Sequence, residues 1–207
     1  MPRSSRAQMA LHRQDVLEGA AHLLRSSGPA AVTVAAATAG AGLTAGAFYK
    51  QFVSKDALLS EASNWAVDRS REDFDRLLKN TPEQNSTRDT LITAYLSDAH
   101  VDDLGSGCVI STLASDVTRD PESPMGDAVS VAITELVRLL TSADGDRERA
   151  LTDAATIVGA VVIARAARGS DASDEILRAA RHALVPDQAV GDGENKAMRT
   201  QGASERG

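Results

Sequence analysis

The sequence predicts an all-α protein in which a small N-terminal module of short helices is joined by a long helix to a larger helical body. Alanine is abundant while only 3% of the residues are aromatic, a composition that favours helices over sheets. Apolar residues recur at helical spacing through the second half of the chain, and no segment predicts a convincing strand. The β-branched run at 161–163 lies inside a long alanine-rich helical pattern.

The N-terminal elements follow from caps and breakers. Residues 1–11 predict a disordered arm, and a helix follows from His12 to Ser27, where Gly28 and Pro29 end it. Three hydroxyl residues can cap the next helices: Thr33 before a short helix at 34–40, Thr44 before one that ends near Phe52, and Ser54 before a long helix at 55–79.

The remaining chain predicts about five further helices and a tail. The helices are expected at 86–100, 107–118, 123–142, 147–168 and 172–185. After Pro186 the chain is polar, contains glycine and has no hydrophobic period, which predicts disorder. The predicted organisation is therefore an arm at 1–11, a small domain at 12–54, a helical domain at 55–186 and a disordered tail at 187–207.

Charge is distributed unevenly over the 207 residues. The net charge is −7, but residues 1–55 hold six basic and two acidic residues, a net +4, so the remainder carries −11. A basic end on an acidic body indicates a site for a polyanion, although a basic tail without a partner would look the same. Arg3 and Arg6 could reach a DNA minor groove or phosphates, or could simply be solvated.

The chain contains no apolar run near the ~20 residues that span a membrane, and its start lacks the apolar core of a signal peptide. One cysteine excludes an internal disulfide framework and fits a reducing compartment. We therefore expect a cytoplasmic protein.

Residues 41–59, AGLTAGAFYKQFVSKDALL, concentrate three of the six aromatic residues. At 100° per residue, Phe48 and Phe52 share one face of a short helix, while Gly46, Ala47 and Lys50 centre on the opposite face. Such a helix is too short to be stable alone, so the aromatic face must be anchored. The small outer face would suit close approach to a DNA major groove, although simple packing between helices is the alternative.

The segment 13–60 resembles the N-terminal DNA-binding domain of the TetR family of transcriptional repressors. The resemblance covers about a quarter of the chain and includes the glycine after the first helix, the threonine that opens the second, and the run AG-L-T-x-G-x-F-Y-x-x-F-x-S-K-x-A-L. It implies a helix-turn-helix module and a palindromic double-stranded DNA operator. It implies DNA contacts at the following residues: Thr33, Thr44, Ala45, Gly46, Ala47, Tyr49, Lys50 and Lys55.

Two positions depart from the family pattern. The family often has lysine or arginine at the position of Ala45, and histidine at the position of Lys50. Alanine at 45 and 47 cannot read bases by hydrogen bonds, although either residue could contact thymine methyl groups. Hydroxyls and lysine ammonium groups would then bind phosphates, which positions the module without specifying a sequence.

The resemblance also implies that the last two helices form a four-helix homodimer interface with those of a second copy. The residues expected there are small or aliphatic: Ile157, Val158, Val161, Ala164, Ile176, Ala180 and Leu184. A dimer would place two reading helices about one DNA turn apart. The family resemblance further implies that an unidentified small molecule releases the repressor from its operator.

Several residues of the body are candidates for lining a ligand pocket, although each would serve equally well as ordinary core: Trp65, Tyr95, Cys108, Leu113, Val117, Met125 and Ile133. Ser106 could cap a helix that starts at Gly107, which would place Cys108 in its first turn. A helix N-terminus favours a thiolate, so Cys108 is either a reactive sensor or a small buried residue.

No catalytic constellation is visible, so we expect no enzyme, no cofactor and no metal. His100, Asp102 and Asp103 lack a second histidine nearby, which argues against a metal site. The leading hypothesis is a ligand-responsive DNA-binding repressor. The alternative is a dimeric helical binding or scaffold protein with no role on DNA.

Overall fold

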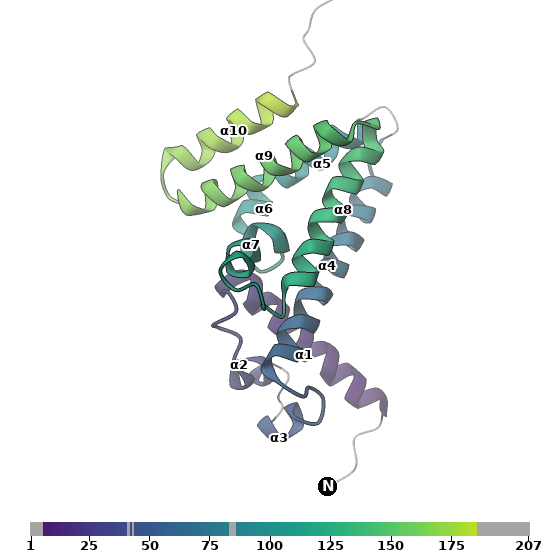
Figure 1. Cartoon of the computed structure of the whole chain (residues 1–207), viewed down its shortest axis with the longest axis vertical. Coiled ribbons are helices and arrows are strands. Elements are labelled where there is room, and N and C mark those ends of the chain that lie inside the picture. The colour runs from purple at the N-terminus through teal and green to yellow at the C-terminus, as the bar shows by residue number, and fades with distance from the viewer. Residues whose placement is uncertain (1–5, 41, 43, 83–85, 186–207) are drawn as a thin grey trace, which may run out of the picture.

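The computed structural model describes residues 6–40, 42, 44–82 and 86–185, with only the backbone of Arg6, Ala45 and Asp144. All regular secondary structure in these ranges is helical (Figure 1), which confirms the predicted fold class. The helices are α1 (Arg6–Ser27), α2 (Val34–Ala39), α3 (Ala45–Phe48), α4 (Lys55–Lys79), α5 (Thr87–Tyr95), α6 (Asp98–Asp102), α7 (Val109–Arg119), α8 (Gly126–Asp144), α9 (Arg147–Ala166) and α10 (Asp171–Leu184).

The three predicted caps at the N-terminal end are all present. Thr33 and Ser54 accept hydrogen bonds from Ala36 N and Ala57 N at 3.1 and 3.0 Å, and the Thr44 hydroxyl accepts one from Ala47 N at 3.3 Å. Each cap satisfies one of the amide donors that a helix start leaves without an intrahelical partner. The bounds of α4 coincide with the predicted 55–79.

α1 begins at Arg6, six residues before the predicted start, so residues 6–11 are helical and are not part of a disordered arm. Alanine, glutamine, methionine and leucine fill this turn and have high helix propensity, and the Gln8 and His12 side chains lie 3.0 Å apart one turn along the helix. Residues 1–5 and the predicted tail at 187–207 lie outside the described residues.

The region predicted as one helix at 86–100 is two helices, α5 and α6, separated by a break at Leu96 and Ser97. Ser97 caps α6 by accepting a hydrogen bond from His100 N at 3.2 Å. α7 starts two residues later than predicted, so its N-cap residue is Cys108 and not Ser106. Instead, Ser106 N donates to the Asp103 side chain within the preceding loop.

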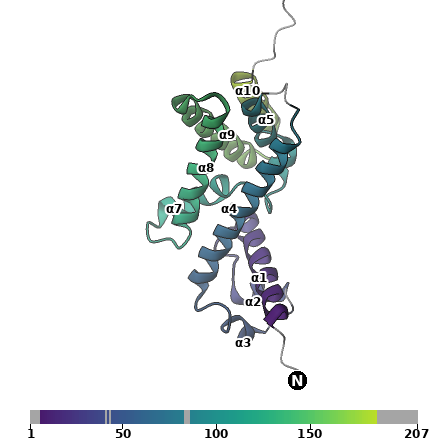
Figure 2. The ribbon, with the colours of Figure 1, turned by 90° about the vertical axis from the view of Figure 1, so that its right-hand side faces the viewer.

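Two clusters of buried apolar side chains follow one another along the molecule. The first joins α1, α2 and the segment around α3 to the first half of α4, α7 and the start of α8. The second is built by α5, α6, α9, α10 and the end of α8, with Ala114 and Ala132 in contact with both clusters. α4 and α8 therefore run beside each other from one cluster to the other, as both views show (Figures 1 and 2).

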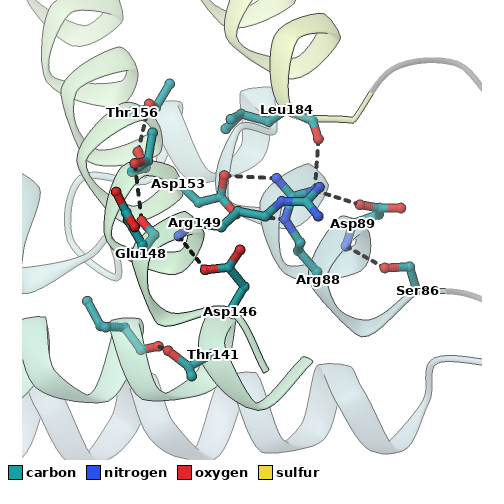
Figure 3. Close-up of polar contacts among 12 residues, drawn as sticks. Ser86, Arg88, Asp89, Thr141, Asp146, Glu148, Arg149, Asp153, Thr156 and Leu184 are labelled. Atoms are coloured by element: carbon teal, nitrogen blue, oxygen red, sulfur yellow. Dashed lines mark hydrogen bonds and ion pairs between the residues drawn. The ribbon is translucent and has the colours of Figure 1, made fainter. Parts of the chain in front are cut away.

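A buried ion pair connects three helices of the second cluster, α5, α9 and α10 (Figure 3). Arg88 of α5 donates from Nε and Nη2 to the two carboxylate oxygens of Asp153 in α9, at 2.7 and 2.8 Å. Arg88 Nη1 also donates to the Leu184 carbonyl at the end of α10. This hydrogen bonding to Asp153 raises the pKa of Arg88, and the one guanidinium fixes three helices relative to one another.

Candidate nucleic-acid interface

α3 is held in place by two phenylalanines on its inner side. Phe48 and Phe52 are fully buried, and their rings stack with centroids 5.3 Å apart. Tyr49 lies on the outer side, where 63% of its surface is exposed, although its ring still meets Phe48 edge-on. The segment thus presents a side chain with a phenolic hydroxyl to solvent from a backbone that the aromatic residues anchor in the core.

The remaining predicted contact residues surround this outer side. Thr33, Thr44, Gly46, Lys50 and Lys55 are exposed, while Ala47 is half-buried. Only the backbone of Ala45 is described, so nothing is assigned to its side chain. The structure therefore places two ammonium groups, a phenol and two hydroxyls on one end of the molecule.

Arg13 of α1 holds the α3 segment against α1 and α4. The sequence prediction did not include this residue. Its Nη1 donates to the Gln51 carbonyl at 2.8 Å, its Nη2 pairs with Glu61 of α4, and its guanidinium carbon lies 4.2 Å from the centroid of the Phe52 ring. One side chain thus joins α1, the end of the α3 segment and α4. Arg13 lies one turn before Val16 and Leu17 on the inward stripe of α1, a position that indicates an inward-facing base.

Residues 16–62 match the family model described as bacterial regulatory proteins, tetR family. This segment contains the second half of α1, the short helices α2 and α3, the start of α4, the three caps and the anchoring phenylalanines. Residues 16–62 are therefore a TetR-family domain. They carry that family's DNA-binding helix-turn-helix, as the sequence predicted.

Solved structures show that the TetR fold extends over nearly the whole chain. A TetR-family regulator from Agrobacterium tumefaciens aligns with a TM-score of 0.68 and 22% identity, over 85% of this chain and 98% of that one. One from Chloroflexus aurantiacus gives 0.67 and 24%, over 86% and 94%. The reduced form of Escherichia coli NemR gives 0.67 and 20%, over 82% and 94%. No curated protein is significantly similar to the chain.

The seven candidate pocket residues are not gathered in one place. Tyr95 and Cys108 line a small cavity between α4, α5, α7 and α8. Ile133 is exposed on α8, where it lines an open apolar groove against α9. The remaining four pack in the first core cluster: Trp65, Leu113, Val117 and Met125.

Three of the residues expected at the dimer interface, Ile157, Val161 and Ala164, are completely buried within the protomer. A second copy therefore cannot reach them, and that part of the prediction is wrong. Four others are partly buried against the same cluster: Val158, Ile176, Ala180 and Leu184. α9 is apolar nearly all round, so its sequence could not indicate which side faces inward. The large apolar residues that α9 exposes are Leu151, Val162 and Ile163.

The loop between α6 and α7 connects the body to the DNA-binding module. His100 Nδ1 lies 2.6 Å from the Tyr95 carbonyl, and His100 Nε2 accepts a hydrogen bond from Cys108 N at 3.2 Å. Gly105 lies directly against the ring of His22 in α1, where a Cβ would clash. The loop thus touches both the cavity at Cys108 and the first helix of the module.

Arg25 of α1 is buried at the same junction. Burial lowers its pKa, while the negative charges of Asp103 in the loop and Asp73 in α4 act in the opposite direction. Its Nε donates to the Ala21 carbonyl at 3.2 Å. The described residues contain no group of three side chains that could hold a metal ion, and no helix among them is long and apolar enough to cross a bilayer.

Proposed function

We propose that the protein is a ligand-responsive transcriptional repressor that binds a palindromic operator as a homodimer and leaves it when a small molecule binds. The observation that supports this best is the braced α3 segment. Its two phenylalanines are buried, while Tyr49 and Lys50 are exposed beside Lys55. Aromatic anchorage of a single helical turn with a small, positively charged outer side suits insertion into a major groove.

The proposed contacts divide into two kinds. Thr33, Thr44, Tyr49, Lys50 and Lys55 would bind phosphate oxygens, since hydroxyls and ammonium groups are donors of the right kind. The segment at 45–47 would approach the bases, where alanine methyl groups can meet thymine methyl groups. Because phosphate contacts release bound counterions, operator affinity should fall steeply as salt rises.

Release by a ligand is proposed as a two-state equilibrium. DNA would bind best to the conformation whose two α3 segments lie ~34–36 Å apart, one DNA turn. The ligand would bind best to a conformation with a different spacing, and the two affinities would then oppose each other reciprocally. α4 runs from the DNA-binding module into the helical body, and we propose that it couples the ligand site to the spacing of the two α3 segments.

The experiment is a mobility shift with the purified protein and DNA from upstream of its own gene, over a series of salt concentrations. The test variant replaces Tyr49 with Phe and Lys55 with Gln. We expect tight, sequence-selective, salt-sensitive binding by the wild type and none by the double variant, with unchanged melting. The matched control is Lys79→Gln, which removes an exposed lysine from the other end of α4. Equal DNA binding by the double variant and the wild type would exclude the proposed docking.

Thiol sensing at Cys108 is a second candidate mode of release. Cys108 is the N-cap residue of α7, is half-buried and lines the cavity beside Tyr95. One similar structure is the reduced form of E. coli NemR, which makes the thiol worth testing in this chain. Cys108→Ser should then still bind DNA but no longer be released by a mild electrophile. Unchanged release would assign Cys108 a structural role.

The alternative of a dimeric scaffold without a DNA role predicts a different outcome in the same mobility shift. Binding would be weak and equal for any duplex. The Tyr49 and Lys55 replacements would then alter only association with an acidic protein partner.

A further inference from the structure

The hydroxyl of Tyr95 is a buried donor without an acceptor. Tyr95 is 2% exposed, and its Oη has no hydrogen-bond partner among the described residues. The Cys108 thiol and the Ser111 hydroxyl are close enough to influence the pKa of Tyr95, which burial raises, but the geometry gives its hydroxyl no hydrogen bond to either group. A buried polar group of this kind is costly, so a native protein usually pairs it.

Tyr95 and Cys108 line a cavity of about 30 Å³ between α4 and α8. By volume it holds about two water molecules at most. Most of its other lining residues are apolar, among them Phe74, Ile110 and Leu136. The Tyr95 hydroxyl is therefore an unpaired hydrogen-bond donor in a mainly apolar lining.

The charged residues at this cavity neutralise each other. Arg71 Nη2 of α4 lies 3.2 Å from Glu135 Oε1 of α8, and Arg138 adds a further hydrogen bond to the same carboxylate. No unpaired charge remains among the lining residues to compensate a charged ligand for its lost hydration. The lining thus favours an uncharged ligand.

We propose that this cavity is the effector site, and that it takes a compact, uncharged, mostly apolar ligand whose single acceptor oxygen binds the Tyr95 hydroxyl. The inference rests on the proposed function, to which it adds the chemical class of the ligand. Entry of anything larger than water requires α4 and α8 to move apart at the Arg71–Glu135 pair, which turns binding into a displacement of α4.

The cavity is also connected to the DNA-binding module on its other side. Cys108 ends the loop in which Gly105 lies against His22 of α1. Gly107 in the same loop is confined by Arg165 and by the Asp103 carbonyl, so the loop has little room to deform on its own. A ligand that displaces Cys108 would consequently shift a contact to α1.

The test compares two probes of similar shape, acetophenone and ethylbenzene, of which only acetophenone has a carbonyl oxygen. Binding to the full-length protein is measured by NMR titration. We expect the wild type to bind acetophenone about three- to tenfold more tightly, as one hydrogen bond allows. Tyr95→Phe should lose this preference and keep its affinity for ethylbenzene. Tyr49→Phe makes the same change on an exposed ring and should keep the preference.

Three results would overturn the inference: equal affinity of the wild type for both probes, a preference that persists in Tyr95→Phe, or no saturable binding of either probe. Thermal melting supplies an independent check. Loss of an unpaired hydroxyl should leave the melting temperature of Tyr95→Phe unchanged or a few degrees higher, whereas a clear decrease would mean that the hydroxyl already has a partner.

A mobility shift on the same preparations separates this inference from the proposed function. Operator binding without the probe preference would retain the regulator and reject this site. The probe preference without any sequence-selective DNA binding would retain the ligand class and reject the regulator. Acetophenone forms no bond to a thiol under these conditions, so the result is also independent of Cys108 reactivity.

Discussion

Arg13 holds the α3 segment of the proposed DNA-contacting surface in place without being part of that surface. Its guanidinium donates to the carbonyl of Gln51, pairs with Glu61 and covers the Phe52 ring. Replacing Arg13 with Ala should therefore free the end of the α3 segment. We expect operator affinity to fall about tenfold, which corresponds to roughly 1.4 kcal/mol, and the protein to remain folded.

Arg13→Lys distinguishes charge from geometry, since lysine keeps the charge but lacks the planar fork that reaches two acceptors. In a mobility shift, the operator affinity of Arg13→Lys should be intermediate between those of the wild type and Arg13→Ala. Arg69→Ala is the matched control, because Arg69 also lies over an aromatic ring, that of Trp65, and pairs with Glu72 without contacting α3. Equal losses in Arg69→Ala and Arg13→Ala would contradict the positioning role.

Replacement of Asp153 is expected to lower the stability of the folded protein by a defined amount. Both of its carboxylate oxygens accept from Arg88 in the interior (Figure 3), so Asp153→Ala removes the buried counter-charge of this guanidinium and leaves only the partly exposed Asp89. The loss should be about 3–5 kcal/mol, which for a chain of this size lowers the melting temperature by roughly 6–20 °C. Calorimetry measures it directly.

The double variant Arg88→Met/Asp153→Leu tests the cause of that loss. An apolar pair of similar volume removes both charges at once and should melt within a few degrees of the wild type. If the double variant melts as low as Asp153→Ala, the destabilisation comes from lost packing and from the freed Leu184 carbonyl, and not from the unpaired charge.

At the scale of helices, the sequence predicted best where the start signal was local. Ser54 and Asp56 mark the start of α4, and the observed and predicted bounds agree at both ends. The break between α5 and α6 depends on Ser97, one capping residue inside a region whose apolar period continues.

The interface residues were less predictable because the choice of face depends on distant contacts. Phe48 and Phe52 were predicted as anchors, since two aromatic residues on a short helix leave no alternative. α9 gives no such signal, and only its packing against α8 and α10 determines that Ile157 points inward and Leu151 outward. The inward orientation of Arg13 could have been predicted from the sequence, because this residue lies on the buried stripe of α1.

His100 of α6, which contacts the start of α7, predicts a pH dependence of stability. Burial lowers the pKa of His100, and the nearby positive charge of Arg165 acts in the same direction. The neutral ring, with its proton on Nδ1, can donate to the Tyr95 carbonyl and accept from Cys108 N, whereas a protonated ring would place two donors face to face at Cys108.

The unfolded chain therefore binds a proton near pH ~6.5 that the folded protein resists. Stability from this group is present above pH ~6.5 and is lost as the pH falls from there toward the lowered pKa of the folded state. His100→Asn cannot titrate, so its melting temperature should decrease less than that of the wild type between pH 7.5 and 5.5. Parallel curves for the two proteins would assign the acid sensitivity to other groups.

At the scale of the whole molecule, the proposed homodimer requires a face on which two copies can meet. Leu151, Val162 and Ile163 expose about half of their surface on α9, and an open apolar groove between α8 and α9 begins at Leu151 and Ile133. If this face joins two protomers, a charge on it would be buried without a partner on association. Leu151→Glu should therefore convert a dimer to a monomer, which sedimentation measures.

Operator binding should fall together with the dimer, because one protomer can occupy only one half-site and loses the contribution of the second. A drop of at least 100-fold in apparent affinity is expected, on the order of the gain that linked sites provide. Ser115→Glu adds the same charge at an exposed position of α7 and should leave both the mass and the DNA affinity unchanged. A Leu151→Glu protein that stays dimeric would place the contact between protomers elsewhere, and its DNA affinity would then be unaffected.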